Sequence, residues 1–288
     1  MYSFVGACKL IGEVVAQPVS LVLLWIGCSG DTRRKHRIRV LAWSGCFLFA
    51  VLEMLPSFVL LNFEGMLAPL VLLVVSLRML GVERRPVQHD KSGDRLYVGT
   101  VVAAAGIANF LLSQVTFLNA TLTFIVALQS ILLPLIMGMK ISLPLVDTMG
   151  NSLLFKTQYG PSPFDRSFPQ VRVLIPPTDV AVVYACTGLR EILIVIFAVL
   201  FTRAEQQEKK KTLWLAGSII YGANLLRNNL VIALYGGRRT SFEIVHSLIG
   251  NIIVFLALTA AALIVFFTIP EVPDRLFSIF KLKKIWPR

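Results

Sequence analysis

Long apolar runs separated by short polar gaps dominate the hydrophobic pattern of this chain. A membrane-spanning helix needs about 20 largely apolar residues at a rise of about 1.5 Å per residue, and such runs recur along the whole sequence. The pattern predicts an all-α fold, a polytopic integral membrane bundle of about eight or nine transmembrane helices. The predicted spans are residues 3–28, 40–62, 65–80, 96–118, 120–139, 142–157, 180–201, 212–235 and 244–269.

Composition agrees with a membrane protein. Hydrophobic residues make up 56% of the chain, whereas soluble domains contain about 45–50%. No stretch has the composition of a soluble domain, so residues 1–288 are predicted to form a single integral membrane domain. Two of its spans have weaker signals: 3–28 contains Lys9 and Glu13, and 142–157 is short and contains Asp147.

The net charge of +12 comes from basic residues gathered in the polar gaps. The gaps at 33–39, 81–95 and 203–211 and the end of the chain hold most of them, which is the distribution of cytoplasmic membrane loops rather than of a nucleic-acid-binding surface. We therefore predict a multi-pass protein of the cell membrane with a basic cytoplasmic tail at 271–288. Five basic residues fall on the predicted outer side: Lys156, Arg166, Arg172, Arg238 and Arg239.

One long polar connection is predicted to face outward. Residues 158–178 are rich in proline, which favours an ordered turn or a short hairpin over a helix. Within it, residues 171–175 (VRVLI) have the pattern of a strand. Thr178 or Asp179 is placed to cap the span that follows.

Cys186 is the most informative residue, because it lies with Arg190 and Glu191 near the outer start of an apolar span. A charge inside a membrane span is costly and indicates a functional site. A thiol near a helix N-terminus and beside arginine is well placed to form a reactive thiolate. If one helix covers 180–201, Arg190 lies on the same face as Cys186. Cys8, Cys28 and Cys46 have apolar surroundings and are predicted to be packing residues.

Two later spans each contribute one further group to the same layer. Counted along ideal helices, Cys186 lies about 9 Å below the outer surface, Arg227 about 12 Å and His246 within about 6 Å. A nucleophilic thiol needs a base and an anion-stabilising group, and these are the residue types that supply them. Asn224 and Asn228 flank Arg227 and are predicted to orient its guanidinium. The four cysteines lack metal-binding spacings, so no metal site is predicted.

Three short motifs resemble those of the exosortase/archaeosortase family of membrane transpeptidases. Residues 185–190 (ACTGLR) are similar to its A-C-[ST]-G-L-R signature, residues 224–228 (NLLRN) to its second motif, and His246, followed by Gly250 and Asn251, to its third. The resemblance covers about residues 95–270, which leaves residues 1–95 as accessory helices. The asparagine after Arg227 and the compact size favour the archaeal branch, with a bacterial exosortase as the alternative.

The resemblance implies a protein-sorting enzyme, an intramembrane cysteine protease or transpeptidase. Its partners would be secreted proteins that end in a short motif, an apolar helix and basic residues. Cys186 would cleave near the motif through a thioacyl intermediate and pass the new C-terminus to a membrane lipid, on the extracytoplasmic side. His246 would act as general acid or base, Arg227 would stabilise the oxyanion or orient the substrate, and no cofactor would be required. A hydrolase that only cleaves, a membrane transporter and a non-catalytic assembly factor for surface proteins remain alternatives.

Overall fold

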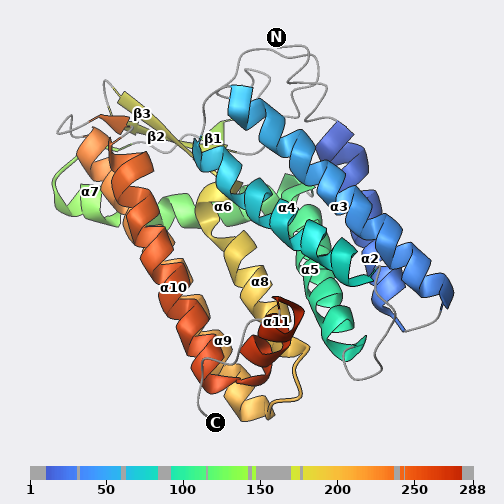
Figure 1. Ribbon diagram of the computed structural model, residues 1–288. Coiled ribbons are helices and arrows are strands. Elements are labelled where there is room, and N and C mark those ends of the chain that lie inside the picture. The colour runs from blue at the N-terminus through green and yellow to red at the C-terminus, as the bar shows by residue number, and fades with distance from the viewer. Residues whose placement is uncertain are drawn as a thin grey trace. The chain divides into compact units, whose positions relative to one another are not determined.

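The computed structural model describes residues 11–30, 33–59, 63–83, 92–114, 116–141, 145–146, 170–175, 178–236, 241–242 and 244–280. The fold is mainly helical, as predicted, with one small antiparallel sheet (Figure 1). The chain divides into two compact units. The first comprises Met1–Ala108, Phe197–Ala204 and Ile269–Arg288, and the second comprises Asn109–Ile196 and Glu205–Thr268.

Four of the described helical segments are long and apolar enough to cross a membrane. They are Arg34–Leu55, Gly93–Ser113, Leu118–Ile136 and Ile244–Thr268. Each overlaps a predicted span, so the prediction of a helical, membrane-spanning chain is supported at this coarser level. The predicted total of eight or nine spans remains a prediction.

The first unit is a bundle of helices. In chain order they are the π-helix η1 (Ile11–Ala16), α2 (Gln17–Cys28), α3 (Arg33–Val59), α4 (Phe63–Glu83), α5 (Ser92–Gln114, of which the part to Ala108 belongs here) and α11 (Glu271–Phe280). Its core contains Leu24, Trp43, Met79 and Ile279. Small residues let the helices approach closely: a Cβ added at Gly45 would lie 2.1 Å from Ser20 Oγ, between α3 and α2.

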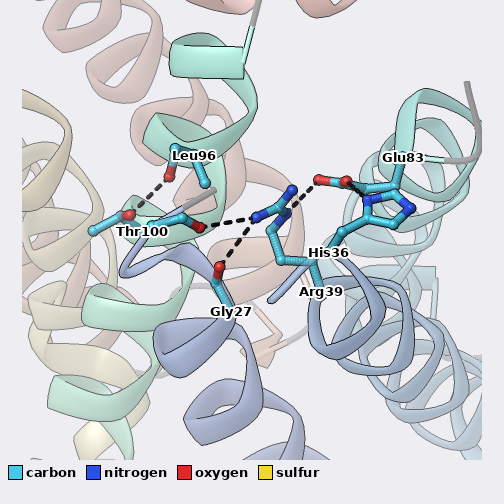
Figure 2. Close-up of polar contacts among 7 residues, drawn as sticks. Gly27, His36, Arg39, Glu83, Leu96 and Thr100 are labelled. Atoms are coloured by element: carbon cyan, nitrogen blue, oxygen red, sulfur yellow. Dashed lines mark hydrogen bonds and ion pairs between the residues drawn. The ribbon is translucent and has the colours of Figure 1, made fainter. Parts of the chain in front are cut away.

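A buried ion pair links α3 to α4 in this unit (Figure 2). Arg39 Nε donates to Glu83 Oε1 at 2.9 Å, and the two residues are 2% and 0% exposed. Arg39 Nη1 also donates to the carbonyl oxygens of Gly27 and Gly30, each at 3.2 Å, and His36 Nδ1 lies 2.9 Å from Glu83 Oε2. Residues 33–39 were predicted to be a polar gap before a span at residue 40. That boundary was wrong, because α3 begins at Arg33 and Arg39 is buried against its partner.

We expect Glu83→Gln to lower the free energy of unfolding by about 2 kcal/mol, because the buried Arg39 guanidinium loses its carboxylate counter-charge inside the bundle. Denaturant unfolding in mixed micelles measures this change. Glu208→Gln is the matched control, since Glu208 is exposed and its substitution should stay within about 0.5 kcal/mol. Equal stability of the two variants would mean that the buried pair contributes nothing.

Part of the predicted cytoplasmic tail is an ordered helix. Residues Glu271–Phe280 form α11, and its residue Ile279 is 5% exposed. Arg78 Nε on α4 donates to the Ile279 carbonyl at 2.9 Å, and Arg275 lies 4.7 Å from the ring centroid of Tyr97 on α5. The tail therefore begins as a helix packed on the first unit, and residues 281–288 lie outside the described residues.

The second unit combines helices with the sheet. Its elements are α6 (Thr116–Ser130), α7 (Leu132–Ile136), β1 (Leu145–Val146), β2 (Gln170–Ile175), β3 (Thr178–Val183), the 3-10 turn η3 (Tyr184–Thr187), α8 (Leu189–Leu200, of which the part to Ile196 belongs here), α9 (Gln206–Gly236), the π-helix η4 (Ile244–Ile249) and α10 (Gly250–Thr268). Val126, Val173, Val182 and Ile232 are among its core residues, so the sheet and the helices share one core.

The sheet corrects two predicted spans. Strand β2 pairs antiparallel with both β1 and β3, with Val173 opposite Val180 and Leu145 opposite Val171. The predicted strand at 171–175 is confirmed within β2. The predicted helix at 180–201 was wrong at its start, because buried Val180 and Val182 alternate along β3 and α8 begins only at Leu189. Thr178 and Asp179 therefore belong to β3 and do not cap a helix.

The span at 142–157 was also wrong where the structure describes it, since Leu145–Val146 form strand β1. Pairing with β2 provides hydrogen-bond partners for the backbone N–H and C=O groups of these two residues. In a helix, the same groups would be paired within the helix itself. The remainder of the predicted span and most of the proline-rich loop lie outside the described residues.

Helices α9 and α10 lie side by side (Figure 1). Thr212 near the start of α9 donates to Thr268 at the end of α10 at 2.7 Å. Arg227 on the second half of α9 contacts His246 of η4, immediately before α10. The two helices are therefore antiparallel, and the candidate site lies at the end of the pair where α9 finishes and η4 begins.

Candidate functional site

Cys186 lies in a tight turn between the sheet and α8, not in the first turns of a helix as predicted. The 3-10 turn Tyr184–Thr187 is followed by Gly188, whose φ of 72° lies in the left-handed region that favours glycine. Thr187 is fully buried; its hydroxyl donates to the Tyr184 carbonyl at 2.7 Å and accepts from the Leu189 N–H at 3.3 Å. The threonine and glycine of the ACTGLR segment thus shape the turn that carries the thiol.

Tyr184 anchors the start of this turn, which lies outside the four candidate spans. Its hydroxyl donates to Asn109 Oδ1 at 3.3 Å, and its side chain is 8% exposed. Burial raises the pKa of Tyr184 above its ordinary value, with nearby Arg190 opposing that shift. The phenol therefore remains a protonated hydrogen-bond donor at neutral pH.

The carbonyl of Cys186 is held by helix α9. Asn228 Nδ2 donates to Cys186 O at 2.9 Å, and Asn228 is 6% exposed. The cysteine itself is half-buried and packs against the core of the second unit. Asn228 was predicted to orient Arg227, but its hydrogen bond instead joins α9 to the cysteine turn.

Asn224 also meets the cysteine turn rather than the guanidinium. It is 4% exposed, and its Nδ2 donates to the Ile220 carbonyl one turn earlier on α9 at 3.0 Å. A Cβ added at Gly188 would lie 2.3 Å from that Nδ2, so the amide packs directly on the glycine backbone. The prediction that Asn224 and Asn228 orient Arg227 is replaced by contacts to the turn that holds Cys186.

Arg227 and His246, which the sequence analysis placed in one site, are in direct contact. Arg227 Nη2 lies 2.9 Å from His246 Nε2. A guanidinium has only donors, so His246 Nε2 is the acceptor in this pair. The imidazole is consequently neutral in this arrangement, with its proton on Nδ1.

Gly250 provides the surface on which the arginine side chain rests. A Cβ added at Gly250 would lie 2.8 Å from Arg227 Nε and 3.1 Å from its Cγ. Among the described residues, the buried Nε has no hydrogen-bond acceptor. Any side chain at position 250 would therefore displace Arg227.

An aromatic stack that the sequence reading missed sets the ring orientation of His246. Phe242 stacks on the imidazole at a centroid distance of 4.8 Å and an interplanar angle of 18°. Tyr235 at the end of α9 meets Phe242 edge-on at 5.4 Å and 73°. The spacing of four residues between Phe242 and His246 is the signal that could have revealed this pair.

Arg190 does not lie on one helical face with Cys186. It is exposed in the first turn of α8, whereas Cys186 lies in the preceding 3-10 turn. The predicted shared helical face was wrong because Gly188 interrupts the helix between them. The same interruption removes the basis for the predicted depth of Cys186, which assumed a helix from residue 180.

The polar arrangement is thus an arginine–histidine pair and a cysteine turn, both attached to α9. Among the residues that the structure describes, no group of three or more His, Cys, Asp or Glu could hold a metal ion. Arg238 and Arg239, predicted near this end, lie outside the described residues. Comparisons with protein-family models, with curated proteins and with solved structures find no match for this chain.

Proposed function

We propose that this protein is a membrane-embedded cysteine transpeptidase similar to the exosortase/archaeosortase family, with the archaeal branch favoured. In this proposal it cleaves the C-terminal sorting signals of secreted proteins and transfers the new C-terminus to a membrane lipid. One observation carries the proposal: adjacent residues of α9, Arg227 and Asn228, contact His246 and the Cys186 carbonyl respectively. The sequence analysis assigned Cys186, Arg227 and His246 to one reaction, and α9 either carries or contacts all three residues.

The first chemical step uses the Cys186 thiol as nucleophile. Sγ bonds to the scissile carbonyl carbon as its proton passes to His246, and the carbonyl electron pair moves onto oxygen. The Arg227 guanidinium stabilises the resulting oxyanion. When the intermediate collapses, the C–N bond breaks and the leaving amine takes the proton from His246. A thioester on Cys186 remains.

The Arg227–His246 contact gives this step an order. His246 Nε2 is occupied by the guanidinium in the substrate-free arrangement and cannot take a proton at that atom. As oxyanion character develops, Nη2 can turn from the imidazole to the substrate oxygen, which frees Nε2 to act as base. Arg227 would then link oxyanion stabilisation to proton transfer.

Transfer completes the reaction. A hydroxyl or amine of the acceptor attacks the thioester carbon, its proton passes to His246, and the S–C bond breaks to regenerate the Cys186 thiol. A lipid acceptor gives a transpeptidase product, and water gives simple hydrolysis. The residues of the chain perform the same operations in both cases.

The placement in the cell membrane rests on two observations. Four helical segments are long and apolar enough to span a bilayer, and basic residues are concentrated at 33–39, 81–95 and 203–211 and at the end of the chain. In this proposal, by the positive-inside rule, these basic segments and the C-terminus face the cytoplasm and the Cys186 end faces the extracytoplasmic side, where secreted substrates arrive.

The proposal is tested with purified protein in liposomes and a reporter that ends in a sorting motif, an apolar helix and a basic cluster. We expect a shortened reporter whose mass includes a lipid. A shortened reporter without lipid would identify a hydrolase. An intact reporter, across a panel of signals from secreted proteins of the source organism, would contradict the proposal and favour a transporter or an assembly factor.

A further inference from the structure

We infer that Asn228, assisted by Asn224, is a positioning residue that holds the backbone of the nucleophile Cys186 against α9, the helix that carries Arg227. Its catalytic meaning rests on the proposed function, but the contacts themselves do not. Asn228 Nδ2 reaches the Cys186 carbonyl at 2.9 Å, and both asparagines are more than nine-tenths buried. A buried side-chain amide that donates to the backbone of the nucleophile's own residue is well placed for this role.

The hydrogen bond matters because it attaches the turn to α9, whereas Tyr184 anchors the start of the turn through Asn109. The peptide plane after Cys186 contains the carbonyl that Asn228 holds, so fixing that oxygen fixes the rotation about the Cys186 backbone. Since Cβ is attached to the same Cα, the direction of the Cα–Cβ bond is fixed with it, and Sγ is confined to the staggered χ1 rotamers about that bond. Thr187 closes the turn on itself but does not attach it to α9.

Asn224 supplies a second point of contact one helical turn away. Its amide packs on Gly188, where a Cβ would lie 2.3 Å from Nδ2. The spacing of four residues between Asn224 and Asn228 places both on one face of α9. The two asparagines therefore hold the turn on both sides of Thr187.

The same helix carries the group that acts on the reacting carbonyl. Arg227 lies three residues after Asn224 and contacts His246 at 2.9 Å. Because α9 is continuous from Gln206 to Gly236, one rigid element holds both the cysteine turn and the guanidinium. A loss of the Asn228 contact would misalign the thiol without removing any reacting group.

The first test is Asn228→Asp, which keeps the shape but exchanges the donor for a titratable group. As a carboxylate it repels the Cys186 carbonyl, and as a carboxylic acid it can donate to that oxygen. We expect reporter cleavage about tenfold slower than wild type at about pH 8, mainly in kcat rather than KM. The ratio of variant to wild-type rate should rise toward one as the pH falls to about 5.

The second test reads the turn directly, without catalysis. In Asn228→Ala, amide hydrogen exchange in peptides that cover residues 184–188 should rise at least about tenfold. Asn229→Ala is the matched control, because Asn229 contacts the Gln129 carbonyl and the Leu133 N–H instead. Its exchange should rise around residues 129–135 and stay at the wild-type level in the turn.

The two tests separate the inference from the proposed function. An inactive wild type with raised exchange in Asn228→Ala would contradict the proposed function and retain the positioning of the turn. Wild-type exchange in Asn228→Ala would overturn the inference. A variant-to-wild-type rate ratio for Asn228→Asp that is independent of pH would also overturn it, because donation to the carbonyl would then not control the rate.

Discussion

Cys186→Ala is expected to abolish reporter cleavage, with a loss of at least about 10⁴-fold, while the protein remains folded and inserted. The reason is that no other described group can take the place of the sulfur: Arg227 and His246 are paired with each other, and Asn228 contacts only the backbone of the cysteine residue. The half-buried side chain lies at the edge of the core, so its removal costs little packing. Single-turnover cleavage and denaturant unfolding measure the two quantities.

The remaining cysteines provide the control. Cys28 and Cys46 are 9% and 3% exposed in the first unit, where they pack between helices, and Cys8 lies outside the described residues. Replacing all three by alanine should retain most of the cleavage rate per folded molecule. A cysteine-to-alanine variant at 186 that cleaves at the wild-type rate would end the covalent account.

Arg227→Lys is expected to lose at least about a hundredfold in cleavage rate, since the loss of one oxyanion donor typically costs about 10²–10³-fold. Lysine keeps the positive charge but has a single nitrogen. Its three N–H donors radiate from that one nitrogen, so it cannot reproduce the planar fork with which a guanidinium can contact His246 and present a second nitrogen to a developing oxyanion. Substrate capture should persist, because the change affects the reacting centre.

The matched control for this variant is Arg203→Lys. Arg203 is exposed and lies outside the segments that form the site, so its substitution should leave the rate unchanged. Chemical rescue adds a second check: guanidinium ion should restore part of the activity of Arg227→Ala but not of Cys186→Ala. Near-normal cleavage by Arg227→Lys would reduce Arg227 to a simple counter-charge and remove the oxyanion assignment.

The grouping of Arg227 with His246 could be predicted because both signals are local. Each is a polar residue in or beside an apolar helix, where burial requires a partner. The roles of Asn224 and Asn228 could not be predicted in the same way. Their position on the face of α9 follows from helical spacing, but their partner, the 186–188 turn, is brought to them by the sheet.

The sheet itself shows why the start of the cysteine segment was misassigned. Val180 and Val182 read equally well as the beginning of an apolar helix, and only their pairing with β2 decides for a strand. That pairing is a tertiary contact, which outweighs local propensity. Gly188 was the available local signal, because a glycine between two apolar runs often marks a change of backbone direction.

The predicted start of the span at residue 40 was wrong for a related reason. Arg39 was placed outside the membrane because a lone arginine avoids apolar surroundings. In the structure Glu83, 44 residues later in the chain, neutralises it and two backbone carbonyls accept from its guanidinium. Helix α3 therefore extends through the predicted polar gap to Arg33.

The central claim is that Cys186 forms a thioester with the cleaved substrate, and the most direct test is to trap it. Purified protein in liposomes is mixed with the reporter, quenched in acid within one turnover and analysed by intact mass and peptide mapping. The account predicts an adduct on Cys186 equal in mass to the reporter portion before the cut and released by hydroxylamine. Complete cleavage without any adduct, or an adduct on another residue, would contradict it.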